Sequence, residues 1–179
     1  MRTCILIICI SVICPNLSFA QESGKLRIGL DIGYPKVNES VFGLLGAIEL
    51  KYNLRDNMNI GLKAEGVSFT KHKSYSANVL SFSVTYDYYF HAEGSRWAPF
   101  IGAGLGYYFC NVSDSSFSDK KHSYNNPTCF IRTGFEFKKF RTFFAYNLIR
   151  KPSESNLSNR NSDYISLGIG FYIGGGIWK

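Results

Sequence analysis

Strict alternation of apolar and polar residues repeats in eight segments of this chain, and this repeat limits the folds open to it. Alternation over about ten residues is typical of a β-strand with one apolar face, because successive side chains of a strand point to opposite faces. Polar breaks that contain Gly or Asn separate the segments and favour turns. The chain shows no helical periodicity that would compete with this interpretation. The eight predicted strands are Leu26–Tyr34, Leu44–Leu54, Met58–Phe69, Val79–Phe90, Phe100–Cys110, Thr128–Lys138, Arg141–Ile149 and Tyr164–Gly174.

The breaks between the segments differ in length in a regular way. Arg55–Asn57 and Lys139–Phe140 are tight turns, and His91–Pro99 is of modest length. Consecutive antiparallel strands place alternate connections at opposite ends of a sheet. We therefore expect a meander with its long loops at one end, namely Pro35–Gly43, Thr70–Asn78, Asn111–Pro127 and Arg150–Asp163.

The residue sizes on the two faces indicate which face meets lipid. A soluble lipocalin-like barrel would turn its apolar face inward, and a membrane barrel would turn it outward. The polar face is rich in glycine, which adds no solubility but leaves room for long side chains inside a narrow barrel. Bulky residues such as Phe82, Tyr86 and Phe135 suit lipid better than a small lumen. The expected lumenal charges are Arg27, Asp31, Glu49, Lys51, Lys63, Glu65, Asp87, Arg132 and Glu136.

These features predict an all-β fold, an eight-stranded antiparallel up-and-down transmembrane β-barrel. Closure is required in a bilayer, because an open sheet would leave edge backbone groups unpaired in hydrocarbon at several kcal/mol each. Aromatic rings near strand ends are typical of the interfacial girdles of such barrels. The candidates for these girdles are Tyr34, Tyr86, Tyr88, Tyr107, Tyr146, Tyr164 and Trp178.

Two Gly-alternating runs carry a family resemblance, Pro99–Tyr107 (PFIGAGLGY) and Ser166–Gly174 (SLGIGFYIG). Both are similar to segments of small outer-membrane β-barrel proteins, the group of OmpX-like and OmpA-transmembrane-domain-like barrels in the style of the Bacteroidota porin family. The resemblance covers essentially the whole mature chain and implies a location in the outer membrane. It also implies insertion by the barrel-assembly machinery, which reads a terminal aromatic residue, here Trp178. The resemblance implies little about activity.

The N-terminal stretch 1–20 is interpreted as a secretory signal peptide. A basic start precedes the apolar run Cys4–Val12, and Ser18 and Ala20 place small residues before Gln21. The outer-membrane barrel domain would then span residues 21–179, in which Cys110 and Cys129 are the remaining cysteines. They flank the expected loop Asn111–Pro127, so both a disulfide and two free thiols stay open. Alternation points Cys110 inward and Cys129 outward, which opposes a bridge unless a β-bulge resets one strand.

The charge pattern bears on partners. Lys and Arg number 20 against 13 Asp and Glu, but the basic residues are scattered and form no run with interleaved aromatics. We therefore expect no nucleic-acid partner. Outer-membrane lipid and lipopolysaccharide phosphate are the expected partners, together with an extracellular ligand held by the loops. The expected state is a monomer.

The sequence offers little chemistry for catalysis or for metal binding. His72, His91 and His122 are scattered, and none has a Cys or carboxylate at metal-ligand spacing. The neighbouring serines Ser74 and Ser123 lie in Ser-rich segments, where such pairs arise by chance. The lumenal charges are expected to pair with one another, as buried charges must. We predict no catalytic residue, no cofactor and no metal.

The sequence therefore favours a structural or surface-interaction role through the extracellular loops, chiefly Asn111–Pro127 and Arg150–Asp163. Two alternatives remain at this point. One is narrow, porin-like passive transport through the lumen. The other is modification of lipid A at the rim, because enzymes with eight-stranded barrels exist.

Overall fold

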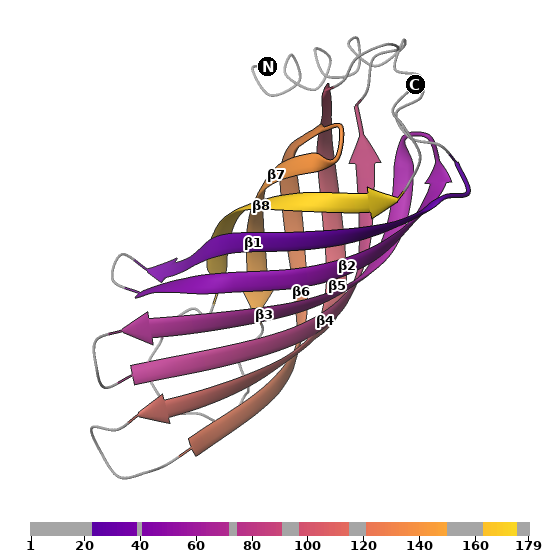
Figure 1. The fold of residues 1–179 in the computed structure, drawn as a ribbon. Coiled ribbons are helices and arrows are strands. Elements are labelled where there is room, and N and C mark those ends of the chain that lie inside the picture. Colours follow the sequence, from indigo (N-terminus) through magenta and orange to yellow (C-terminus); the bar gives the residue numbers. More distant parts are fainter. Residues whose placement is uncertain are drawn as a thin grey trace, which may run out of the picture.

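The chain closes into one barrel (Figure 1). The computed structural model describes residues 23–38, 41–71, 75–90, 97–114, 121–149 and 163–174. The expected signal peptide lies outside these residues. The strands are β1 (Leu26–Asn38), β2 (Val41–Arg55), β3 (Met58–Lys71), β4 (Tyr75–Tyr89), β5 (Trp97–Asp114), β6 (Lys121–Phe137), β7 (Phe140–Ile149) and β8 (Tyr164–Gly174).

Each strand pairs antiparallel with its neighbours in sequence, and β1 also pairs antiparallel with β8. The closing ladder runs from Arg27 opposite Gly174 to Lys36 opposite Ile165. It gives hydrogen-bond partners to the two strands that would otherwise be sheet edges, which is the condition for strands to cross a bilayer. The predicted eight-stranded antiparallel fold is confirmed.

Most strands are longer than the alternation predicts, and most of the expected loop Asn111–Pro127 is a β-hairpin. The ladder between β5 and β6 continues through Asn111 opposite Ser123 to Ser113 opposite Lys121. The expected loops Pro35–Gly43 and Thr70–Asn78 are likewise largely strand. A strand that leaves the bilayer needs no apolar face, so its sequence loses the alternation that marked the other segments. The last expected loop lies outside the described residues except for Asp163.

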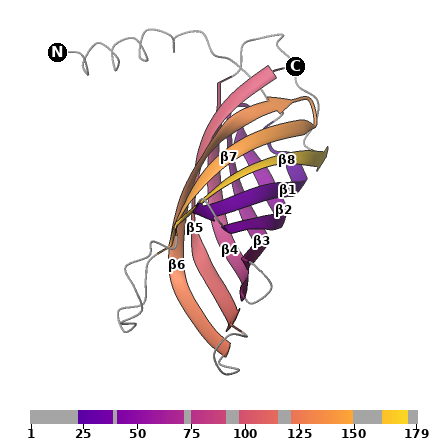
Figure 2. The ribbon, with the colours of Figure 1, turned by 90° about the vertical axis from the view of Figure 1, so that its left-hand side faces the viewer.

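The outer face of the barrel is apolar, as predicted. Large side chains such as Leu44, Leu62 and Leu105 expose 62–71% of their surface, and Phe82 and Phe135 lie on the same outer face. The described residues contain no helix long and apolar enough to cross a membrane. The apolar outer face is formed by the strands, whose closed arrangement is seen from two sides in Figures 1 and 2.

The interior is not the single polar layer that the sequence suggested. The charged residues gather in the half nearer the short turns, where Tyr89 and Phe100 are also buried, and apolar residues predominate in the half nearer the longer hairpins. The apolar cluster of that second half includes Leu45, Val67, Phe69, Val79 and Phe143. These residues have the inward parity of their strands, so the assumption of one apolar and one polar face is wrong in this half of the barrel.

Glycines make room for the interior rings. A Cβ atom on Gly104 would clash with the ring of Phe130, and one on Gly168 would clash with the ring of Phe143. Glycine is therefore required at these two positions by the close approach of an aromatic side chain from the neighbouring strand. The predicted use of glycine to admit large inward side chains is confirmed at both places.

The expected aromatic girdles need one correction. Tyr34, Tyr86 and Tyr107 are exposed on the outer face, as predicted. Tyr164 is buried inside the barrel, because it shares inward parity with Ser166, which lies two residues later on β8. Tyr88 and Tyr146 are half-buried, and Trp178 lies outside the described residues.

A charge on the outer face tests its contact with lipid. Leu105 lies midway along β5, so Leu105→Arg should cost about 2–4 kcal/mol of unfolding free energy in lipid vesicles. Asn111 is exposed on the same strand nearer its outer end, and Asn111→Arg should cost about 0–1 kcal/mol. Urea unfolding in vesicles measures both. Equal losses would contradict a lipid-facing position for Leu105.

Candidate functional site

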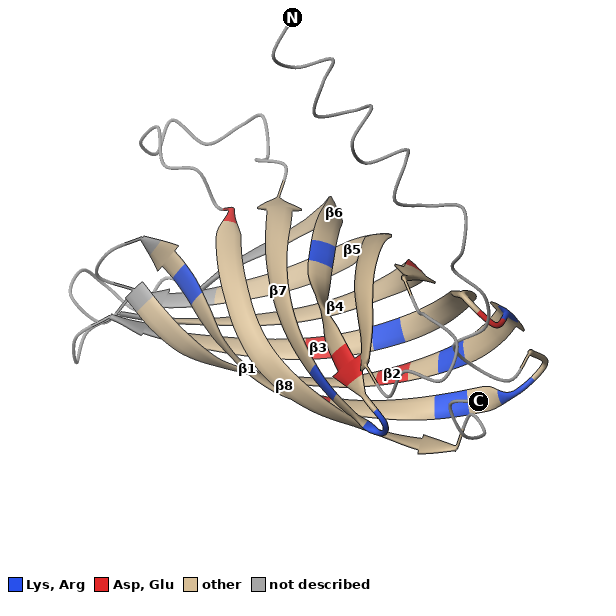
Figure 3. Cartoon of the chain, turned by 90° about the horizontal axis from the view of Figure 1, so that it is seen from above, with Lys and Arg blue, Asp and Glu red and all other residues tan. Residues whose placement is uncertain are grey.

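The nine lumenal charges proposed from the sequence are all buried inside the barrel. They come from five strands, and inward parity places each of them on the polar face of its strand. Viewed from above, blue and red segments mark charged residues on several strands around the barrel (Figure 3). The members are Arg27 and Asp31 on β1, Glu49 and Lys51 on β2, Lys63 and Glu65 on β3, Asp87 on β4, and Arg132 and Glu136 on β6.

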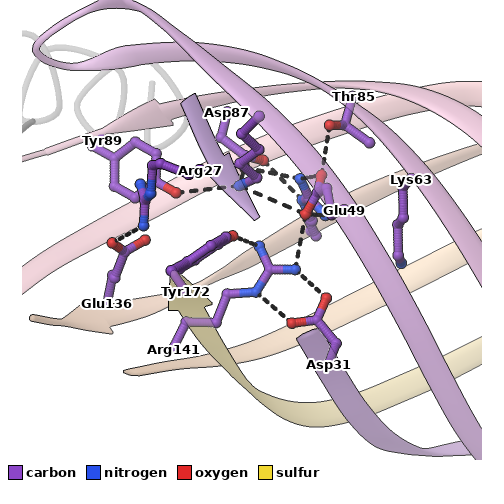
Figure 4. A network of polar contacts seen from close by, with 12 residues as sticks. Arg27, Asp31, Glu49, Lys63, Thr85, Asp87, Tyr89, Glu136, Arg141 and Tyr172 are labelled. Atoms are coloured by element: carbon purple, nitrogen blue, oxygen red, sulfur yellow. Dashed lines mark hydrogen bonds and ion pairs between the residues drawn. The ribbon is translucent and has the colours of Figure 1, made fainter. Parts of the chain in front are cut away.

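The centre of the network is the guanidinium of Arg132, which joins the carboxylates of Glu49 and Asp87. Both carboxylates are labelled in Figure 4. The Nη2 of Arg132 donates to Glu49 Oε1 at 2.6 Å, and its Nε donates to Asp87 Oδ1 at 2.8 Å. Lys51 forms an ion pair with Asp87, and its Nζ lies 3.7 Å from Glu49 Oε2. Thr85 Oγ1 also donates to Glu49 Oε1, at 2.6 Å. Both buried carboxylates are therefore held by cations from other strands.

Arg141 of β7 belongs to this network, although the sequence analysis did not include it. Its Nε donates to Asp31 Oδ1 at 3.0 Å, and its Nη2 lies 3.0 Å from Glu49 Oε2. Its Nη1 donates to the hydroxyl of Tyr172. Two features of the sequence could have identified Arg141. One is the inward parity that it shares with Phe143, and the other is the excess of one negative charge in the nine predicted residues. The nine residues hold four cations and five carboxylates, and Arg141 brings them to balance.

Two smaller contacts flank the central network. Arg27 pairs with Glu136, and its guanidinium lies 3.9 Å from the ring centroid of Tyr172. Lys63 pairs with Glu65, which also accepts a hydrogen bond from the Tyr164 hydroxyl at 2.7 Å. All five carboxylates of the network therefore have a cationic partner within the described interior.

The network and the apolar cluster lie in series along the barrel axis. Inward residues of β2 run from Lys51 and Glu49 to Leu45, and those of β3 run from Lys63 and Glu65 to Val67. This arrangement holds the strands in register. Along the axis from the short turns, the interior is filled first by ion-paired side chains and then mainly by apolar side chains. It offers ions no run of unpaired charges on the described wall.

The two cysteines are free, so the disulfide left open above is not formed. The ladder pairs Cys110 with Tyr124 and Cys129 with Leu105. Cys129 is thus five residues along β6 from the residue that pairs with Cys110, a displacement of about 16 Å at the rise of a β-strand. The correction follows from the hairpin, which extends far beyond the point where the sequence placed the loop.

The histidines that would serve catalysis or metal binding are dispersed in the chain. His72 and His91 lie outside the described residues, and His122 is in β6 opposite Val112. Within the described ranges, no group of three His, Cys, Asp or Glu side chains is placed to hold a metal ion.

Comparison with known proteins identifies the architecture. The structure of Neisserial surface protein A (NspA) is similar, with a TM-score of 0.61 and 15% identity over 83% of this chain and 95% of that chain. The N-terminal β-barrel domain of Pseudomonas aeruginosa OprF is also similar, with a TM-score of 0.54 and 17% identity over 86% and 100%. The chain has the fold of a small outer-membrane β-barrel.

Other comparisons limit what this barrel can be said to do. The outer membrane enzyme PagL matches with a TM-score of 0.52 and 16% identity, over 82% of this barrel and 98% of that chain. No family model matches the sequence, and no curated protein matches it. The expected resemblance to small outer-membrane barrels is confirmed for the fold, whereas identities this low say nothing of activity.

Removing the central cation should be costly. Arg132→Met leaves Glu49 and Asp87 with fewer partners, so the unfolding free energy should fall by about 3–5 kcal/mol. Adding Glu49→Gln should recover part of the loss, because one uncompensated carboxylate is removed with it. Lys36 is exposed, and Lys36→Met serves as the control. Additive losses in the double variant would contradict direct coupling of Arg132 and Glu49.

Proposed function

We propose that this outer-membrane barrel has a non-catalytic role at the cell surface, in which the barrel anchors binding segments at its outer end. The observation that supports the proposal is the unequal length of the strands. β5 and β6 have 18 and 17 residues, whereas β7 and β8 have 10 and 11. The ladder of β6 with β7 ends at Thr128 opposite Ile149, but the ladder with β5 continues to Lys121.

The excess length lies beyond the lipid-facing surface. Outward positions of β4, β5 and β6 change from large apolar residues to the exposed Asn78, Asn111 and Asn125. Asn78 is opposite Asn111 in the ladder, and Asn125 is opposite Phe109. This polar row supports a bilayer boundary at that level. The β5–β6 hairpin, which extends beyond the other strands in Figure 2, would then stand outside the membrane.

The sequence next to the outer ends of β6 and β7 is basic, which suits a phosphate-bearing partner. In the sequence, Lys120 precedes β6, Lys121 is its first residue, and Arg150 and Lys151 follow β7. We propose that they contact lipopolysaccharide phosphate and outer ligands of similar charge. The proposal includes a monomeric barrel, inserted by the barrel-assembly machinery after removal of residues 1–20, with the short turns in the periplasm.

Absence of catalysis is part of the proposal and does not follow from the fold, since PagL is an enzyme with a similar fold. It rests on the sequence, in which the three histidines are scattered and none has a Cys or carboxylate at metal-ligand spacing. We therefore propose neither lipid A modification nor a cofactor for this barrel.

The filled interior supports a barrel that does not conduct. We expect the refolded protein in planar lipid bilayers to produce no discrete current steps, because paired charges and the apolar cluster follow one another along the axis. Single-channel recording measures this directly. Reproducible unitary currents that disappear in the Glu49→Gln variant would contradict a closed lumen and favour transport.

Shortening the hairpin tests the surface role. Replacing Asn111–Ser123 by Asn-Gly, a favoured two-residue hairpin turn, removes the projecting part with Lys120 and Lys121, and also Asp114 and Asp119. Binding to purified lipopolysaccharide should weaken in this protein. Lys120→Gln with Lys121→Gln in the full-length hairpin isolates the cations and should weaken binding about tenfold or more, at about 1 kcal/mol for each cation lost. Binding is measured with the detergent-refolded protein, and heat-modifiable gel migration reports the intact barrel.

The matched control keeps the hairpin and removes the same number of charges of the opposite sign from it. Asp114→Asn with Asp119→Asn should not weaken lipopolysaccharide binding, because carboxylates repel phosphate. Unchanged binding by the shortened protein would overturn the proposed role of the hairpin.

A further inference from the structure

Four cations lie along one continuous arc of the rim at the end that carries the short turns. Lys25 precedes β1, Arg55 ends β2, and Lys138 and Lys139 form the turn between β6 and β7. The backbone N–H of Gly24 donates to the carbonyl of Asn53 at 2.8 Å, which joins the start of β1 to the end of β2. Lys139 Nζ donates to the carbonyl oxygen of Gly174 at the end of β8.

The arc carries a net positive charge at the surface. Lys25, Arg55 and Lys138 are exposed, and Lys139 is half-buried. Asp56 is the acidic residue beside them in the described turn of β2 and β3, and its Oδ1 accepts a hydrogen bond from the backbone N–H of Ser23 at 3.0 Å. Partial burial lowers the pKa of the Lys139 ammonium from its usual value, and the Arg27 guanidinium acts in the same direction.

The cations lie directly beside the lipid-facing surface. At this end the ring centroids of Phe140 and Phe171 are 5.1 Å apart, and those of Trp97 and Phe137 are 4.8 Å apart. The ammonium of Lys138 lies 5.6 Å from the Phe137 ring centroid. Aromatic belts occupy the headgroup level of a bilayer, so these cations would be held at the depth of lipid phosphates.

The backbone conformation at Lys138 indicates that a lysine is kept at this position for its charge. Its φ is 55°, in the left-handed region that is uncommon for residues other than Gly, Asn and Asp. A lysine at the first position of this two-residue turn is therefore less favourable for the backbone than the usual turn residues. The turn nevertheless presents two consecutive ammonium groups between Phe137 and Phe140.

We propose that this arc binds the headgroup of an anionic phospholipid, with the phosphate at Lys138 and Lys139 and the acyl chains against the neighbouring aromatic rings. Phosphate and a long apolar tail together match a surface on which cations adjoin exposed rings. A soluble phosphate compound would use the cations alone. The inference is independent of the hairpin, and in the proposed orientation the lipid lies in the inner leaflet.

Retention of defined lipids tests the proposal. The detergent-refolded protein is titrated with phosphatidylglycerol or with phosphatidylethanolamine of the same acyl chains, and bound lipid is counted by native mass spectrometry. We expect phosphatidylglycerol to be retained more strongly by about fivefold for each cation engaged. Inorganic phosphate at equal concentration should not compete, because it lacks the acyl chains.

The variants keep the turn while removing its charge. Lys138→Asn suits a positive φ, and Lys139→Gln retains a donor for the Gly174 carbonyl. Together they should bring phosphatidylglycerol retention down to the level of phosphatidylethanolamine. Lys36→Gln is the matched control, since Lys36 is also exposed and its Nζ lies 5.8 Å from the ring centroid of Phe42, at the opposite end.

Several results would overturn the proposal. These are equal retention of the two lipids, unchanged retention in the double variant, or an equal loss in Lys36→Gln. Displacement of the lipid by inorganic phosphate would assign the arc to soluble anions and would likewise overturn it. Heat-modifiable migration of every variant shows that the barrel is intact, and lipopolysaccharide binding, measured separately, reports whether the hairpin proposal stands.

Discussion

The need to pair every backbone N–H and C=O group within hydrocarbon governs this structure. A sheet can meet that need in a bilayer only by closing, and here β1 and β8 close it along their whole shared length. Closure of eight strands then sets a narrow interior. The size of that interior explains the density of inward glycines.

A narrow interior makes buried charge the next constraint. Isolated charges away from water are very unfavourable, so each carboxylate must meet a cation from another strand or from its own. Arg132 and Arg141 meet this need with planar guanidinium groups that reach two carboxylates each. The network therefore links β1, β2, β4, β6 and β7 across the lumen, and it gives the barrel a specific internal register in addition to its backbone ladder.

The alternation of residues was enough to predict the number of strands, their order and the lipid-facing side. It succeeded because lipid imposes an apolar residue at every second position, as at Leu62 and Leu105. It failed where lipid no longer acts. The sequence beyond Asn111 loses the alternation of apolar residues, although its strands continue. Tyr164 follows the parity of its strand rather than the rule that tyrosines at strand ends face lipid.

Arg141 shows a different limit of sequence analysis. Its parity was available, yet only the three-dimensional network shows that Asp31 and Glu49 both lie within its reach. The separation of the two cysteines could not be predicted from the sequence either, because it depends on how far β5 and β6 pair rather than on which residues they contain. Pairing length between polar strands has little signature in a single sequence.

The fit of each interior ring against a glycine has an evolutionary consequence. Phe130 occupies the volume that a side chain on Gly104 would need, and Phe143 does the same at Gly168. Neither partner of such a couple can change size alone without leaving a void or a collision. Drift in the lumen should therefore proceed through compensated double exchanges between adjacent strands, while lipid-facing positions, which have no such counterpart, are free to vary among apolar residues one at a time.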